Sequence, residues 1–442
     1  MTDADLKEDG SLMVAWRAFE KTEQYANVVR WCAQEKLRNR CLLYAFREGF
    51  LASEEARLVE EKTLKRNDVH DMLLLIVVLG VLFLVLMSSP AHCQVQHQTP
   101  PAPLSVRYVD NQYPNASDSN DGKTEQTPWL TIEHAMATIA AGTTCYVKAG
   151  DYYPSTQGAY VELLHSGSPG SWVTLAAYPG DKGFVVVHGR GLLAEQRSYL
   201  EFRGLRVVDT PDKGILVLGP GVDGVRVLGC ETYDTFSSGI SVQGVRYPAD
   251  PGDYDNVRDV LISGNDVRLA THGGADECIT IAWGVSGLSV VGNIVADGEL
   301  YESPRLGDEG IDLKEGVRDA VVEGNLLFNL GHNAIYLEAG RGSPSFPAGP
   351  DPVLGDILVT RNVVHDTRSN GISVTTEGRG VVDGVTITNN LVFRTEHNGV
   401  ILYDQSGGGT IQNVSVVNNT TAYCGGDPNE YLSGEYEFGG GI

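Results

Sequence analysis

Two stretches, ILVTRNVVHDTRSNGISVTT (residues 357–376) and VTITNNLVFRTEHNGVILYD (residues 385–404), align without a gap. Each has an apolar stretch ending near an Asn, a second apolar stretch, and an Asn-Gly pair before a third. Short strands separated by turns, repeating every 20 to 50 residues or so without helices, are typical of a solenoid. A propeller needs about 40 residues and four strands in each blade, so we exclude it.

The same pattern continues on the N-terminal side of these stretches. An Ile-containing step such as Gly239-Ile240-Ser241-Val242 or Gly310-Ile311-Asp312-Leu313 follows each Asn turn. A single coil cannot bury its apolar face, so the coils must stack, and the turn amides of adjacent coils are then in hydrogen-bonding reach. We predict an all-β, right-handed parallel β-helix from about Tyr199 onward, with a ladder of asparagines at positions 265, 293, 325, 362, 390 and 419.

The segment before these repeats has a different pattern. It predicts a strand near Tyr108, an amphipathic helix over 130–141 and a strand over 144–148. A helix lying across the first coil would cover its apolar end. This segment resembles the N-terminal cap of secreted β-helix proteins of the pectate-lyase-like superfamily, including family-9 polysaccharide lyases. The resemblance gives a β-helix domain over 107–442 and is carried by Tyr108-Val109, Ser119 to Gly122, Thr127 to Trp129, Ile132, Ala135 and Val147 to Tyr152.

An unbroken apolar run of 16 residues lies at Met72–Met87. As a helix it would span about 24 Å, slightly less than the hydrocarbon core of a bilayer. Basic residues precede the run at Lys62, Lys65 and Arg66, and none follows before Arg107, so the N-terminus should be cytoplasmic. We predict a helical cytoplasmic segment over 1–71, a transmembrane or signal-anchor helix over 72–89 and a linker over 90–106.

Two points about the termini stay open at this stage. If Met72 is the true start, the run is a signal peptide cleaved near Ala91, and the β-helix is secreted. At the other end, Gly439–Ile442 follows a partial coil without an evident cap, which predicts either a fragment or an end protected by a partner.

The charge of the chain is strongly uneven. Residues 1–71 contain 12 Lys and Arg against 14 Asp and Glu, whereas the rest contains 21 against 43 and has a net charge of −22. Such a body repels nucleic acid, which we exclude as a partner, and it is suited to binding cations or to remaining soluble.

Period-2 alternation assigns a face to each strand residue. In Gly310-Ile311-Asp312-Leu313 the Ile and Leu point inward, so Asp312 and Lys314 point outward. Adjacent coils lie about 5 Å apart, which gathers polar side chains of several coils on one outer face. The expected patch consists of Asp276, Glu277, Asp308, Glu309, Asp312, Lys314, His332, Tyr336 and Glu338.

The acidic members of this patch are the ligands that calcium prefers, because Ca²⁺ takes six to eight oxygens and gains from carboxylates. A cation beside Lys314 would favour its neutral form and make it a candidate base. We predict a Ca²⁺ site with Asp276, Glu277, Asp308, Glu309 and Asp312 as ligands.

Family-9 lyases hold calcium with aspartates and use a lysine base, and the resemblance carries these roles to Asp308, Asp312 and Lys314. It implies β-elimination on an acidic polysaccharide: a cation neutralises the uronate carboxylate, the base removes the C5 proton and the C4–O bond breaks. This sequence departs from the family at Glu309, which replaces a second Asp, and at Glu338, where the next coil has no lysine.

His332, Tyr336 and Glu338 complete the prediction as substrate-binding residues. A plainer interpretation stays beside it, in which Lys314 forms only a surface ion pair worth about 0–1 kcal/mol. The corresponding function is a non-catalytic, glycan-binding or adhesin-like surface protein.

Overall fold

The computed structural model describes residues 95–98, 102–155, 157–245, 256–273, 277–298, 309–340, 353–378, 380–405 and 407–425. All described residues belong to one unit of the chain, Leu64–Ile442. The predicted cytoplasmic segment, the apolar run and the C-terminal end therefore lie outside the described residues. Within the described part, no helix is long and apolar enough to cross a bilayer.

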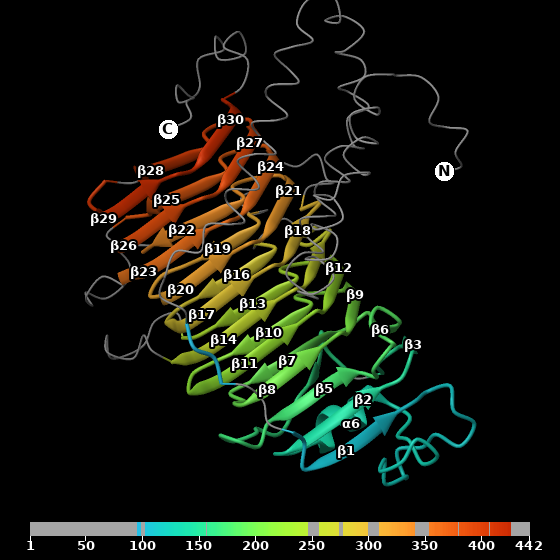
Figure 1. The fold of residues 1–442 in the computed structure, drawn as a ribbon. Helices are drawn as coiled ribbons and strands as arrows, with labels where there is room; N and C mark the ends of the chain where they lie inside the picture. Colours follow the sequence, from blue (N-terminus) through green and yellow to red (C-terminus); the bar gives the residue numbers. More distant parts are fainter. Residues whose placement is uncertain are drawn as a thin grey trace, which may run out of the picture. The chain divides into compact units, whose positions relative to one another are not determined.

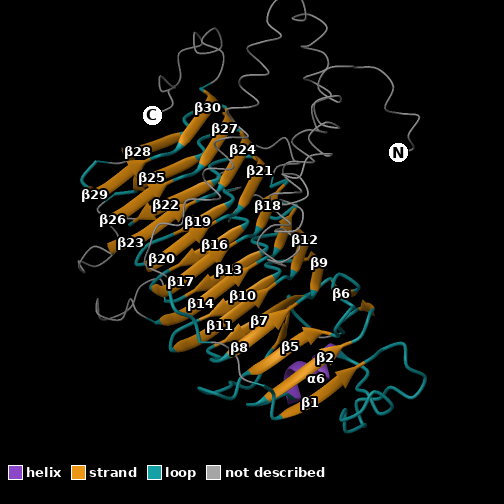
Figure 2. Cartoon of the chain, viewed as in Figure 1, coloured by secondary structure: helices purple, strands orange, loops and turns teal. Residues whose placement is uncertain are grey.

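The described residues form a parallel β-helix, as the repeats predict (Figures 1 and 2). Each coil contributes one strand in turn to three sheets, which we name A, B and C, and every pairing between strands of neighbouring coils is parallel. Stacking begins well before Tyr199, because β2 to β7 already belong to the sheets.

The strands of the three sheets have the following bounds. Sheet A contains β1 (Ser105–Val109), β2 (Thr143–Val147), β5 (Val173–Ala177), β8 (Leu200–Arg203), β11 (Val222–Leu228), β14 (Val257–Ser263), β17 (Val285–Val291), β20 (Arg318–Glu323), β23 (Val353–Thr360), β26 (Val381–Thr388) and β29 (Thr410–Val417). Sheet B contains β3 (Gly150–Tyr152), β6 (Val185–His188), β9 (Arg206–Thr210), β12 (Glu231–Thr235), β15 (Asp266–Arg268), β18 (Ile294–Ala296), β21 (Leu326–Leu330), β24 (Val363–Thr367), β27 (Leu391–Thr395) and β30 (Thr420–Cys424). Sheet C contains β4 (Tyr160–Glu162), β7 (Gly191–Glu195), β10 (Ile215–Leu218), β13 (Ile240–Gln243), β16 (Ile279–Ala282), β19 (Ile311–Leu313), β22 (Ile335–Ala339), β25 (Ile372–Thr376) and β28 (Val400–Asp404).

The core lies inside the coils and is built from like residues stacked on like. In sheet C, Ile311 of β19 pairs with Ile279 and Ile335 in the adjacent coils, and all three are fully buried. β-Branched side chains pack well on a pleated surface, which explains the excess of Ile and Val at these inward positions.

The asparagine ladder is confirmed along its whole length. Each Asn side-chain NH₂ donates to the side-chain oxygen of the next Asn at 2.9 Å, from Asn265 through to Asn419. The left-handed backbone conformation falls on the residue before each Asn, as at Gly324 and Arg361, and not on the Asn itself. The amides thereby satisfy backbone groups that the turns would leave unpaired in a buried position.

A second amide ladder was not predicted from the sequence. It lies at the turn from sheet B to sheet C, where Asn398 donates to Asn370, and Asn370 donates to Asn333, both at 2.9 Å.

The N-terminal cap is confirmed, with a shorter helix than the predicted 130–141. Helix α6 (Ile132–Thr138) begins after Thr131, whose hydroxyl accepts a hydrogen bond from the His134 amide. Its buried residues Ile132, Ala135 and Met136 belong to the apolar core of the β-helix. The helix thereby covers the end of the first coil.

Candidate functional site

The candidate site lies on the outer face of sheet C, over β16, β19 and β22. Thr280, Asp312 and Tyr336 are in register in adjacent coils and alternate with the inward Ile and Leu residues, as predicted. However, Asp312 is 0% exposed and Tyr336 is 4% exposed. At these two positions the outward side chains are therefore buried, which does not fit the interpretation of Lys314 as a surface ion pair.

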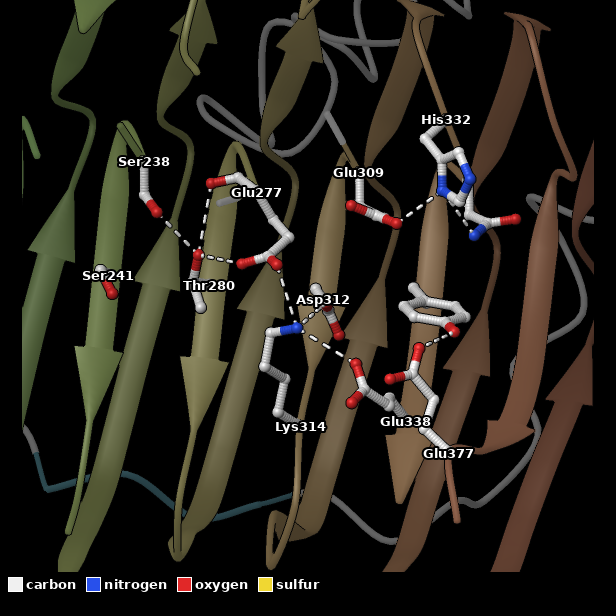
Figure 3. A network of polar contacts seen from close by, with 12 residues as sticks. Ser238, Ser241, Glu277, Thr280, Glu309, Asp312, Lys314, His332, Glu338 and Glu377 are labelled. Carbon is white, nitrogen blue, oxygen red and sulfur yellow. Dashed lines mark hydrogen bonds and ion pairs between the residues drawn. The ribbon is translucent and has the colours of Figure 1, made fainter. Parts of the chain in front are cut away.

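Lys314 follows β19 directly and is the centre of the site (Figure 3). Its ammonium nitrogen lies 2.8 Å from Asp312 Oδ2, 3.0 Å from Glu277 Oε1 and 3.1 Å from Glu338 Oε2. The Lys314 side chain is 16% exposed, whereas the three carboxylates are buried. One ammonium group thus contacts three carboxyl groups, each from a different coil.

Hydroxyl groups hold Glu277 in this position. Thr280 donates from Oγ1 to Glu277 Oε2 at 2.9 Å, and Ser238 lies within hydrogen-bonding distance of the same hydroxyl at 2.8 Å. The carboxylate of Glu277 thereby has one oxygen on the hydroxyl pair and the other on Lys314 (Figure 3). These hydroxyls carried no signal in the sequence, because Ser and Thr are common in strands and turns.

The charges of the cluster do not balance. Burial raises the pKa of the Asp312 carboxyl well above its usual range, with neighbouring carboxylates adding to the increase and Lys314 opposing it. Burial likewise raises the pKa of Glu338 to about 8, again against the effect of Lys314. Burial alone would lower the pKa of Lys314, but the surrounding carboxylates raise it well above its usual value. Lys314 is therefore firmly protonated. Because one ammonium does not neutralise three carboxylates, the cluster can also take up protons or a further cation.

Two buried oxygen atoms in the cluster support the same conclusion. Asp312 Oδ1 and Glu338 Oε1 accept no hydrogen bond from any part of the chain that the structure describes. A buried carboxylate oxygen without a donor is costly unless it is protonated or bound to a cation.

Glu309 and His332 form a separate pair beside the cluster. His332 Nδ1 lies 2.5 Å from Glu309 Oε1, and the imidazole is 40% exposed while the carboxylate is buried. Burial by itself would raise the pKa of Glu309, but the hydrogen bond and charge of His332 outweigh it and lower this pKa. The structure thus gives Glu309 an imidazole partner, and its role as one of the five predicted calcium ligands stays a prediction.

Tyr336 makes its polar contact with the following coil. Its hydroxyl donates to Glu377 Oε1 at 2.9 Å, and burial raises the pKa of this phenol, which stays neutral. Since the ring is almost fully buried, it offers no face to a sugar in this conformation. Glu377 was missed by sequence analysis because a partner 41 residues away leaves no local signal.

The predicted calcium ligands divide into two groups. Asp276 and Asp308 lie outside the described residues, whereas Glu277, Glu309 and Asp312 are described. Among the residues described, no group of three His, Cys, Asp or Glu side chains has the arrangement of a preformed metal site. The donor chemistry of Glu277, Asp312 and Glu338 fits a hard cation. The point on which they converge, however, is taken by the Lys314 ammonium.

No protein family model matches the chain. The uncharacterized protein YwoF of Bacillus subtilis (strain 168) is 28% identical over 342 residues, which cover 71% of this chain and 69% of YwoF.

Three solved structures resemble the chain at low identity. They are pectate lyase Pel9A (16% identity, 74% of this chain and 73% of that one, TM-score 0.45), a rhamnogalacturonan lyase (15%, 72% and 87%, TM-score 0.37) and the periplasmic alginate epimerase AlgG (12%, 65% and 71%, TM-score 0.44). The likeness is one of fold, and the three parallel sheets of this chain establish the β-helix by themselves.

Proposed function

We propose that this protein is an extracytoplasmic, carbohydrate-active β-helix that cleaves a uronate-containing polysaccharide by calcium-dependent β-elimination. The observation that carries the proposal is the Lys314 cluster. Burying three carboxylates and one ammonium costs several kcal/mol of desolvation per ion. Apolar side chains could fill the same space without this cost, so packing alone does not explain the cluster. Buried groups with strongly shifted pKa values are candidates for catalysis.

The charge of the site sets a condition on the substrate. A uronate is an anion, and the cluster already has more carboxylates than cations. A divalent cation held by Glu277 and Asp312, with the predicted ligands Asp276, Asp308 and Glu309, would neutralise the sugar carboxylate and acidify the C5 proton. This requirement makes the proposal easy to test, because activity without a cation would contradict it.

Lys314 is the proposed base. In the ion-paired state the raised pKa keeps Lys314 protonated, so it has no lone pair with which to accept a proton. When its carboxylate partners turn away, burial lowers this pKa and the ammonium releases its proton to water, which leaves the neutral amine as the base. The neutral amine then takes the C5 proton, the C–H electrons form the C4–C5 double bond, and the C4–O bond breaks with its electron pair on the leaving oxygen, which takes a proton from water.

Substrate contacts are proposed for His332 and Glu338. The imidazole of His332 is 40% exposed and is therefore more accessible to a substrate than the buried carboxylate of Glu309. In its protonated form this imidazole donates hydrogen bonds. Tyr336 has a proposed binding role only if its hydrogen bond to Glu377 opens.

The decisive experiment uses purified protein with pectate, alginate and glycosaminoglycans in the presence of calcium. Elimination produces unsaturated uronates that absorb in the ultraviolet. We expect this signal to vanish with a chelator and with Lys314→Ala, and to persist in Lys123→Ala, which removes an exposed ion-paired lysine. Activity that survives in Lys314→Ala would rule out Lys314 as the base.

A non-catalytic glycan-binding role is the alternative, and the triple ion pairing of Lys314 is the observation that favours it. Under this alternative, calorimetry would detect glycan binding while no unsaturated product forms with any of the three polymers.

We also propose that residues 72–89 anchor the β-helix outside the cytoplasm, or that cleavage near Ala91 releases it. Mass spectrometry of the mature N-terminus distinguishes these two forms. Recovery of the protein in the cytosol would contradict both.

A further inference from the structure

A short segment of the predicted linker lies on the β-helix. Of residues 90–106, the structure describes 95–98 and 102–106, and Ser105 and Val106 already belong to β1. Residues 95–98 contact the outer side of sheet A at β11 and β14 (Figure 1). The sequence separation is more than 100 residues, so only the fold brings these parts together.

The binding surface is an ion pair between Arg226 of β11 and Asp259 of β14, which we call the fork. Arg226 Nη2 donates to both carboxylate oxygens of Asp259, at 2.8 and 2.9 Å. Nη1 donates to the carbonyls of Val225 and Asp259, both at 2.7 Å. Arg226 is 1% exposed, and its guanidinium lies 4.9 Å from the ring centre of the buried Trp172.

The fork binds the segment through both main-chain and side-chain atoms. Arg226 Nη2 donates to the carbonyl of Gln98 at 2.7 Å. Asp259 accepts from the Gln98 amide at 3.4 Å, and its Oδ1 lies 2.8 Å from His97 Nδ1. A carboxylate only accepts, so the imidazole carries its proton on Nδ1.

The contact with the segment keeps the Asp259 carboxylate of the fork charged. Burial would raise the pKa of Asp259, but the hydrogen bond from His97 and the charge of Arg226 outweigh it and lower this pKa. The carboxylate therefore stays charged at physiological pH. Removing the segment would take away two donors of the carboxylate and one acceptor of the guanidinium, and a buried ion pair is costly when its partners are missing.

We propose that residues 95–98 are a latch that the fork holds on sheet A, so that the chain joins the β-helix at a defined place. The candidate site occupies sheet C, so the latch lies on a different side of the coil from it. Only seven residues lie between Met87 and Val95, so the eight steps from one to the other reach at most about 29 Å. In a membrane-anchored form, sheet A would thus be held near the bilayer.

Limited proteolysis of the full chain in detergent tests the latch. Cleavage rates between residues 91 and 104, read by mass spectrometry, report how often the segment opens. We expect His97→Ala to raise this rate about tenfold or more, because it removes a hydrogen bond to a charged group. Arg226→Met should raise it further, and Gln96→Ala, at an exposed position of the same segment, should leave it unchanged.

Rates in His97→Ala and Arg226→Met that equal the wild-type rate would overturn the proposal. If Arg226→Met fails to fold, His97→Ala decides alone, because it leaves the fork intact. Equal acceleration by Gln96→Ala would also contradict it, since the segment would then be held by something other than the fork.

Discussion

Replacing Lys314 with Met is the most informative test of the cluster. Methionine keeps most of the apolar stem and removes the ammonium, which leaves Glu277, Asp312 and Glu338 facing one another in a buried place. Loss of one partner from a buried ion pair costs about 3–5 kcal/mol. The protein can reduce this cost by keeping a further carboxyl protonated in the folded state.

The cost of that protonation depends on pH in a predictable way. Keeping a carboxyl with an ordinary pKa near 4 protonated costs about 1.4 kcal/mol per pH unit above it, hence about 4 kcal/mol at pH 7 and about 1 at pH 5. The folded state then binds more protons than the unfolded state, so stability falls as pH rises. We expect Lys314→Met to lose about 4 kcal/mol at pH 7 and markedly less at pH 5.

Urea unfolding at the two pH values, followed by circular dichroism, measures both quantities. The matched control is Lys123→Met, which breaks an exposed ion pair with Asp121 and should cost about 0–1 kcal/mol at either pH. Adding Glu338→Gln to Lys314→Met should recover part of the loss. If Lys314→Met costs no more than the control, or costs the same at both pH values, the buried cluster is wrong.

Three further predictions concern single residues. The pKa of Glu338 is about 8 in the folded state against 4.5 for the free group, so its contribution to stability is lost as pH rises through this window. In thermal unfolding, the stability of Glu338→Gln relative to the wild type should therefore increase from pH 5 to pH 9. Asn362→Ala removes the acceptor of the Asn325 amide and should cost about 2–4 kcal/mol in urea, more than Asn419→Ala at the partly buried end of the ladder; equal costs would contradict a cooperative ladder. Trp129→Ala should cost about 3–5 kcal/mol and expose the first coil, read as binding of a hydrophobic dye; an unchanged melting temperature would exclude a capping role for this buried side chain.

The face that each residue of the candidate site takes could be predicted from the sequence, but its burial could not. Alternation along Gly310-Ile311-Asp312-Leu313 correctly assigned Asp312 to the outer face, because strand periodicity is a local property of the backbone. It also suggested that an outward side chain meets water, which is wrong for Asp312. Burial depends on what covers the sheet, and the period of one strand does not contain that information.

The partners of each side chain were the second limit. Sequence analysis grouped Glu309 with the calcium ligands, and the fold gave it His332, 23 residues away. Likewise, His97 and Asp259 meet across 162 residues of chain. Such pairs depend on turn geometry and on the number of residues between coils, which varies from 28 to 37 along the asparagine ladder.

The sequence by itself determined the β-helix, its asparagine ladder and its helical cap, since each depends on a repeated local pattern that only stacked coils can bury. The tertiary structure decided that Lys314 is saturated by three carboxylates, that a second amide ladder exists, and that residues 95–98 bind to the Arg226–Asp259 fork. The physical reason is distance along the chain. Periodicity specifies which face a residue takes, whereas hydrogen bonds and ion pairs between coils depend on positions that only the stacked fold defines.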